Sequence, residues 1–276
     1  MTAPTADIPP LADGPLELTL TDFNTTVEDV LAARRLLASI FPMEIALLIL
    51  SFASYRPRRS SIKHVKKRYG ANEFWRPGPI AHVAGMYLTL QLPSASEIPE
   101  TVARPKSITF QMDAADQGWA DNGGDGTYHN SHTWFEASIL RRPAPADAEA
   151  ILNIASLAVD GPLVEDWSDM QNFPSPLDAR HHLRGHGWEM LESGDGSIAW
   201  RVHNNVTACR EYRRYCVRWE ARVPTAVADP RAMGDGKGFL ELLRPDDVVV
   251  LWARAEQQAW VNKVRAAAIE IEYELF

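Results

Sequence analysis

Cysteine is almost absent from this sequence of 276 residues, which contains only Cys209 and Cys216. Two cysteines are too few for a disulfide framework and too few for a zinc site built from cysteine. If both lie on one strand, their odd spacing points them to opposite faces, so they would not pair with each other. We therefore expect a reducing compartment and predict a cytoplasmic protein.

Long apolar runs and a leader segment are also missing. No stretch reaches the roughly 18 uninterrupted apolar residues of a membrane-spanning helix. The first residues lack a basic region followed by an apolar one, which a secretory signal would need. The apolar run at residues 45–50 is interpreted as part of a buried helix, and we expect no association with a membrane.

Positive charge is in the minority, because 28 Lys and Arg residues face 36 Asp and Glu residues and the formal net charge is -8. An acidic chain repels the phosphate backbone, so we expect no nucleic-acid partner. The exception is one basic run that contains Arg56, Arg58, Arg59, Lys63, Lys66, Lys67 and Arg68. This run is either a patch for an anion, RNA or an acidic partner, or a solvated face that offsets nearby acidic surface.

The sequence does contain enough apolar material for a core, with 46% hydrophobic residues that include 9 Trp, 7 Tyr and 9 Phe. A disordered chain would not leave so many aromatic side chains in water. The length suits one main domain, or one main domain with a small one attached. We therefore expect a globular fold.

The N-terminal part predicts a tail, a pair of helices and a linker. Residues 1–15 are rich in Pro, Ala and Asp, which is typical of a disordered tail. Thr26 is a candidate N-cap for one helix, and Pro42 suits the first turn of a second helix. We assign residues 16–58 to this helical hairpin and residues 59–82 to a basic linker.

From residue 83 onward the pattern changes to short β-branched and aromatic segments separated by turn residues. The strand candidates are residues 85–92, 107–112, 132–140, 198–204, 212–221, 247–255 and 267–275. Residues 268–275 alternate, with apolar side chains expected on a core and Glu side chains in water. This spacing without intervening helices predicts a mainly β protein, with an antiparallel β-sandwich over residues 83–276. Residues 142–187 are interpreted as an insertion with one helix at residues 147–159.

The second predicted helix carries a family resemblance. Residues 41–53 read Phe-Pro-Met-Glu-Ile-Ala-Leu-Leu-Ile-Leu-Ser-Phe-Ala, which resembles the start of an F-box. The sequence departs from that pattern by Phe41 in place of Leu and by the absence of a clear third helix. The resemblance implies that the hairpin docks a Skp1-like adaptor through Pro42, Ile45, Leu48 and Ile49. These side chains should then be partly exposed, whereas burial against the sandwich would make the hairpin only a part of the fold.

A second resemblance covers roughly residues 105–275 without the insertion. Its motifs are Asp116-Gln117-Gly118-Trp119, Gly126-Thr127-Tyr128, Thr133-Trp134-Phe135-Glu136-Ala137 and Leu251-Trp252-Ala253-Arg254-Ala255. They resemble a fungal domain that occurs in ankyrin-repeat and F-box-like proteins. That family implies a galactose-binding-like jelly roll and brings no established activity, so it supports the fold more than the function.

The first of these motifs is the main candidate for ligand binding, because a glycine-rich loop at residues 122–126 follows it. Asp116 and Gln117 offer directional hydrogen bonds, and the Trp119 ring offers a face for a sugar or another ring. The alternative is a structural corner, in which Asp116 caps backbone N–H groups and Trp119 fills the end of the sandwich. For a small-molecule or carbohydrate ligand, the candidate binding residues are Asp116, Gln117, Trp119, Tyr128, Trp134 and Trp260.

Ionisable residues among the aromatic segments are the candidates for catalysis, namely Asp116, His132, Glu136 and Arg254. Glu136 and Arg254, together with Arg218, would alternatively pair across strands, since a buried charge needs a partner. The sequence contains no phosphate-binding loop, dinucleotide fingerprint, nucleophile elbow or zincin motif. We therefore predict no cofactor.

Metal binding is not predicted either. His129 and His132 would point to opposite sides of a strand. A second group, His181, His182 and His186, falls in the insertion, where loop histidines usually face solvent. Acidic residues near the glycine-rich loop offer oxygen ligands for Ca²⁺, but their spacing does not match an EF-hand loop, and a solvated turn is the simpler interpretation.

Three functions are compatible with the sequence. The first is a binding or recognition module, an F-box-type substrate adaptor whose sandwich recognises a ligand or a protein. The second is a cofactor-independent enzyme of isomerase or cyclase type, or a carrier, acting on a small apolar metabolite in an aromatic pocket. The enzyme requires a cavity of roughly several hundred Å³ with a polarised acid or base. The third is a plain scaffold, in which loops and aromatic residues serve packing alone.

Overall fold

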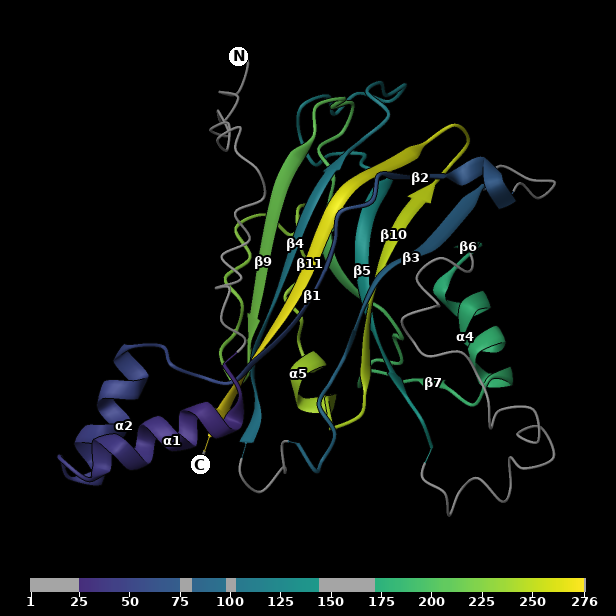
Figure 1. Ribbon diagram of the computed structural model, residues 1–276. Coiled ribbons are helices and arrows are strands. Elements are labelled where there is room, and N and C mark those ends of the chain that lie inside the picture. The colour runs from purple at the N-terminus through teal and green to yellow at the C-terminus, as the bar shows by residue number, and fades with distance from the viewer. Residues whose placement is uncertain (1–24, 75–80, 98–102, 144–171, 276) are drawn as a thin grey trace.

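The computed structural model describes residues 25–74, 81–97, 103–143 and 172–275. Two antiparallel sheets lie face to face, and two helices extend from one end of the sandwich (Figure 1). The predicted fold class, a mainly β antiparallel sandwich preceded by two short helices, is confirmed. The tail predicted at residues 1–15 and the helix predicted at residues 147–159 lie outside the described residues.

The first sheet is built around the long strand β11 (Val261–Leu275). On one side β11 pairs with β4 (Ala103–Ala115), which pairs in turn with β9 (Arg213–Glu220). On its other side β11 pairs with two short strands, β1 (Arg58–Lys63) and β2 (Lys67–Gly70). This order places segments from both halves of the chain side by side.

The second sheet has β10 (Val248–Glu256) between β3 (His82–Gln91) and β5 (Thr133–Arg141). β6 (Asn172–Phe173) continues the sheet beyond β3, while β7 (Glu189–Met190) and β8 (Trp200–Asn204) pair with β5. Every strand predicted from the sequence overlaps an observed strand. The strands confirmed in this way are β3, β4, β5, β8, β9, β10 and β11.

The predicted basic linker at residues 59–82 is wrong in its first part, which forms β1, β2 and the short 3-10 helix η1 (Ala71–Phe74). Charged residues have low β-propensity, so the sequence did not favour strands here. Contacts with distant parts of the chain explain why this segment is nevertheless ordered. Tyr69 of β2 is buried in the core, and the Tyr87 hydroxyl donates a hydrogen bond to the Val65 carbonyl at 2.8 Å.

Aromatic side chains fill the space between the two sheets. Trp219 packs edge-on against Phe110, with ring centroids 5.0 Å apart. Phe239, on the short helix α5 (Phe239–Leu242), lies 5.1 Å from the rings of both Trp219 and Trp200. The alternation predicted at residues 268–275 puts Ile269, Ile271 and Tyr273 of β11 into this core, where all are buried.

The other face of β11 differs from the expectation that its Glu side chains are in water, because Glu272 is buried. Arg218 and Arg58 place guanidinium nitrogens 2.7 Å and 2.9 Å from the Glu272 carboxylate, and Ser107 donates to it at 3.1 Å. Burial alone would raise the pKa of Glu272, but these cations and the hydroxyl lower it below its ordinary value. Arg218 therefore pairs with Glu272 across strands. This is the structural role that the sequence allowed as the alternative to a site role.

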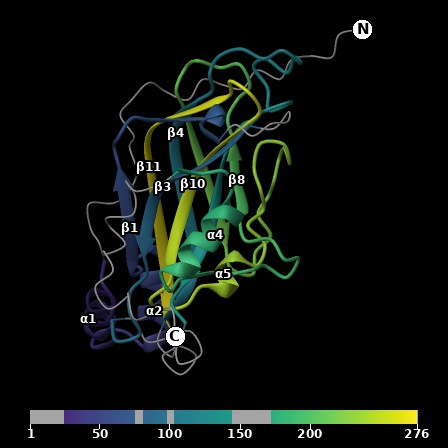
Figure 2. The same cartoon turned by 90° about the vertical axis from the view of Figure 1, so that its right-hand side faces the viewer.

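A helix covers part of the outer face of the second sheet. α4 (Pro176–Gly185) lies over β10, and it buries Leu183 and Ala179 against Trp252 and Trp188 (Figure 2). The prediction of a loop at His181 and His182 is wrong, because both lie on α4. His186 is the residue that ends it. The Ser175 side chain caps this helix by accepting the backbone N–H of Asp178, a signal available in the sequence.

The N-terminal hairpin consists of α1 (Val27–Ala38) and α2 (Met43–Phe52), which begins after Pro42 as predicted. Val27, in the first turn of α1, belongs to the main core, and Val30, Ala46 and Leu50 are buried within the hairpin. The rest of the hairpin projects beyond the sandwich (Figure 1). None of the described helices is long and apolar enough to cross a membrane.

Candidate functional site

Asp116 directly follows the strand β4 and lies in a buried corner. Its carboxylate accepts the backbone N–H of Gln117 at 2.6 Å and that of Ala208 at 2.7 Å. Burial raises the pKa of Asp116 to about 6, against the opposing effect of these hydrogen bonds and of nearby Lys263. Because the side chain is fully buried, it is not accessible to a ligand or substrate in this structure. This geometry is the structural corner that was the alternative to a binding role.

Gln117 is also engaged by the protein itself. Its amide donates to the Trp119 carbonyl at 2.7 Å and accepts the Val261 backbone N–H at 3.2 Å. Gly118, with φ of 100°, lies where an added Cβ would be 1.8 Å from Cγ of Arg210. The absence of a side chain at Gly118 therefore leaves room for Arg210.

Aromatic rings line the same end of the sandwich. The Trp260 ring lies 6.1 Å from the ring of Trp119 and 4.8 Å from that of His132. Trp260 is buried, whereas 38% of Trp119 is exposed, so Trp119 is the accessible member. Burial lowers the pKa of His132, while Glu256 acts in the opposite direction. The structure therefore brings Trp119, Trp260 and His132 together, and Trp119 is the exposed member of the three.

Tyr128 packs against His203, with ring centroids 5.4 Å apart, and His203 in turn lies 4.5 Å from Tyr215. Burial lowers the pKa of His203 to about 4, so this imidazole is neutral at neutral pH. Its Nδ1 lies 2.6 Å from the carbonyl of Asn204, which fits a neutral ring that donates from Nδ1. His203 was not among the site residues predicted from the sequence.

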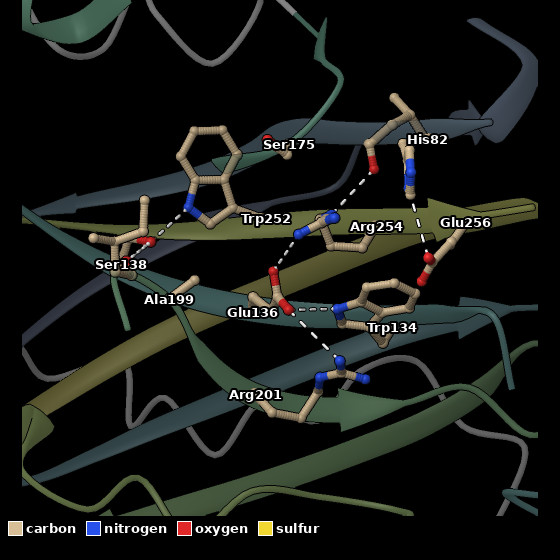
Figure 3. Close-up of polar contacts among 12 residues, drawn as sticks. His82, Trp134, Glu136, Ser138, Ser175, Ala199, Arg201, Trp252, Arg254 and Glu256 are labelled. Carbon is tan, nitrogen blue, oxygen red and sulfur yellow. Dashed lines mark hydrogen bonds and ion pairs between the residues drawn. The ribbon is translucent and has the colours of Figure 1, made fainter. Parts of the chain in front are cut away.

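Trp134, Glu136 and Arg254 meet on the outer face of the second sheet (Figure 3). Glu136 accepts the Trp134 indole N–H at 2.7 Å and the Arg254 guanidinium at 2.5 Å. Arg201 of β8 lies 3.6 Å from the same carboxylate, and its guanidinium is 4.3 Å from the centroid of the Trp134 ring. Arg254 approaches that ring to 5.0 Å and donates to the Val83 carbonyl at 3.2 Å.

This cluster (Trp134, Glu136, Arg201 and Arg254) matches the structural pairing alternative. The Glu136 carboxylate is bound by the Trp134 indole and by two arginines, so these contacts account for its charge within the protein. The sequence missed Arg201, although its place directly after Trp200 on an alternating strand puts it on the outer face beside Glu136. Within the described part of the chain, no group of three His, Cys, Asp or Glu side chains is arranged to hold a metal ion. Cys209 and Cys216 are free thiols.

The residues predicted to bind a partner lie on the surface of the hairpin. Pro42 is exposed, and the exposed fractions of Ile45, Leu48 and Ile49 are 43%, 50% and 37%. The expectation that the whole run at residues 45–50 is buried is therefore wrong, because only Ala46 and Leu50 of this run are buried. Further large apolar side chains are exposed around them, namely Leu36, Ile40, Phe41, Met43, Leu47 and Phe52.

A pocket that the sequence analysis did not foresee lies at the end of the sandwich near α5. Its volume is about 360 Å³, and none of the predicted site residues lines it. The residues that form it come from five separate segments, so no local motif marks it. The nearest signal is the sequence Leu243-Arg244-Pro245-Asp246-Asp247, part of which forms one wall.

Comparison with known proteins gives no family for this chain. No family model matches the sequence, and no curated protein matches it significantly. Among solved structures, the chain is similar to the crystal structure of decameric BFDV capsid protein, with a TM-score of 0.29 and 10% sequence identity. The similarity covers 80% of this chain and 98% of that chain. At this level it carries no conclusion about function or assembly.

The F-box-like, fungal and galactose-binding-like assignments are therefore predictions without a matching family model. The β-sandwich with an N-terminal helical hairpin stands on the structure itself.

Proposed function

We propose that this protein is a recognition module whose helical hairpin docks an adaptor of the Skp1-like class. The observation that carries the proposal is the continuous apolar surface of α2, which the sandwich does not cover. The sandwich then serves as the part that presents a ligand or a protein to the assembly.

The exposed side chains of α2 follow a docking pattern. Ile45, Leu48, Ile49 and Phe52 are spaced i, i+3, i+4 and i+7, which places them on one face of the helix. Phe52 is 82% exposed. Soluble monomers rarely expose large contiguous apolar patches, and such patches mark interaction sites. Covering Leu48 or Phe52 would contribute on the order of 1–2 kcal/mol each to binding.

The kind of partner follows from the chemistry of this face. A helix with apolar anchors at this spacing fits an apolar groove formed by other helices. Pro42, Glu44 and Ile45 also belong to the segment that resembles the start of an F-box, whose partner is a Skp1-like adaptor. Both arguments support the same occupant of the surface.

The proposal is tested with the full chain and a purified Skp1-like adaptor, by light scattering after size exclusion and by titration calorimetry. We expect a 1:1 complex for the wild type. The double variant Ile45→Asp/Leu48→Asp should weaken it at least about 100-fold, since two charges would enter an apolar interface. Leu177→Asp on α4, at a position 54% exposed, is the matched control and should bind like the wild type.

Absence of a complex at about 50 μM of each protein would contradict the proposal, because functional docking pairs bind more tightly than this. So would a complex that the double variant still forms while retaining the wild-type thermal unfolding profile. A dimer of the chain alone that the double variant abolishes would assign the surface to a second copy instead.

The enzyme alternative receives less support from its candidate residues. Asp116 is buried, and Glu136 and Arg254 are bound to each other. The pocket near α5 has a single aromatic lining residue, Tyr273, rather than an aromatic wall.

A further inference from the structure

The pocket near α5 is formed by segments that meet at one end of the sandwich. Leu92 and Pro93 follow β3, Arg104 and Pro105 belong to β4, and Arg222 follows β9. The remaining wall comes from the α5 region and from β11. The complete lining is Leu92, Pro93, Ala103, Arg104, Pro105, Ala221, Arg222, Leu240, Glu241, Leu243, Arg244, Pro245 and Tyr273.

Two of the five wall segments, residues 92–93 and 240–245, are fixed by contacts of one buried residue, Asp247. Arg141 binds it through two nitrogens, both at 2.7 Å, and donates to the Leu242 carbonyl at 2.6 Å. Asp247 also accepts the backbone N–H of Arg244 at 2.8 Å, and its own carbonyl accepts the N–H of Leu92 at 2.8 Å. These two wall segments are thus fixed before a ligand arrives, which lowers the entropic cost of binding.

The inner surface of the pocket is apolar and its rim is cationic. Leu92, Leu240, Leu243 and Tyr273 are buried side chains that face this space. Three arginines and one glutamate line the rim, so its local charge is positive although the whole chain carries -8. Arg104 shares its charge with Glu274 at 3.4 Å.

Arg222 and Arg244 are the two cations available to a ligand. Both are exposed, and neither side chain forms an ion pair with a described residue. Arg222 has a φ of 64°, a left-handed conformation that is uncommon for a residue other than glycine.

We propose that this pocket binds an apolar group that carries a carboxylate. The apolar part lies against Leu240, Leu243 and Tyr273, and the carboxylate binds Arg222 and Arg244, since guanidinium groups pair with carboxylates through two parallel hydrogen bonds. The volume lies at the small end of ligand pockets, which suits a medium-length aliphatic acid or the C-terminal residue of a peptide. The proposal does not depend on what binds the hairpin.

The test is titration calorimetry on the full chain with matched pairs of probes. The first pair is decanoate and decanamide, and the second is the peptide Gly-Gly-Ala-Leu with a free or an amidated C-terminus. We expect at least one acid to bind about tenfold more tightly than its amide, which lacks the charge. Binding of decanoate alone assigns a free acid as the source, and binding of the peptide acid alone assigns a chain terminus.

Variants then locate the site. Arg222→Gln and Arg244→Gln should each weaken binding of the acid about tenfold, whereas Arg184→Gln on α4, outside the pocket, should leave it unchanged. Equal affinity for acid and amide, or no binding of either acid at about 1 mM, would overturn the proposal. Wild-type affinity in both pocket variants would do the same. The comparison of acid with amide uses the wild-type chain and stands even if a variant fails to fold.

Discussion

Replacing Asp116 by Asn should lower the free energy of unfolding, and this loss should become smaller as the pH rises. The Asp116 carboxylate caps two backbone N–H groups in a fully buried corner. Asn offers one acceptor oxygen where two are needed, so one buried N–H meets an amide donor instead. Leaving that N–H unsatisfied costs about 1–3 kcal/mol.

The pH dependence follows from the raised pKa of Asp116. In the folded chain this pKa is about 6, against an ordinary value of 3.8, so the folded state binds the proton more tightly than the unfolded state. The contribution of Asp116 to the free energy of unfolding is therefore full below about pH 4 and is lost as the pH rises toward 6. A difference of about two pKa units corresponds to about 3 kcal/mol.

The assay is urea unfolding of wild type and Asp116→Asn at a series of pH values from about 3 to 7, which spans the ordinary and the raised pKa of Asp116. The destabilisation caused by the variant should shrink as the pH rises. Glu272→Gln is the control with the opposite sign, because the lowered pKa of Glu272 means that its contribution is lost as the pH falls below about 4.5. If the destabilisation by Asp116→Asn is constant or grows with pH, the assigned burial of this carboxyl is refuted.

Other substitutions test the packing described above. Glu136→Gln should cost about 2–4 kcal/mol of unfolding free energy, because the largely buried Arg254 loses its carboxylate, and the double variant with Arg254→Met should recover part of the loss in a denaturation cycle. Gly236→Ala should cost about 3 kcal/mol or more by thermal unfolding, since the new Cβ would lie 2.1 Å from the Trp219 ring, whereas Gly196→Ala, with open space and a similar φ, should cost about 1 kcal/mol. Leu50→Ala should lower the local opening free energy of α1 and α2 by about 2 kcal/mol in hydrogen exchange, and the exposed Leu48→Ala by less than about 0.5 kcal/mol. Equal effects of the two leucine variants would contradict the placement of α2.

The sequence predicted elements whose signal is local. The alternation at residues 268–275 follows from the two faces of a strand, and the start of α2 follows from Pro42, which suits a first helical turn. β1 and β2 were missed because their residues are charged, and they form strands through pairing with β11, which no local pattern encodes. The burial of Glu272 likewise depends on two arginines that are distant in sequence.

The candidate site also depends partly on local signals and partly on contacts between residues that are distant in sequence. The corner at Asp116 was one of two interpretations that the motif allowed, and the choice between them required the position of Ala208, far along the chain. Arg201 joins Glu136 only because β8 pairs with β5 in a particular register. The pocket near α5 has walls from residues 92 to 273, so its existence depends on how the strands end relative to one another.

The short passage from α2 into β1 sets how rigidly a docked partner would be held. Only residues 53–57 separate Phe52 from Arg58, a stretch of at most roughly 18 Å even when fully extended. Pro57 within it is buried, and Arg58 is clamped to Glu272 at the first rung of the sheet. Such a short connection restricts how far the hairpin can move relative to the sandwich. A partner on the hairpin would therefore meet the sandwich at a nearly constant angle, and anything bound near α5 would be presented to it from a fixed direction.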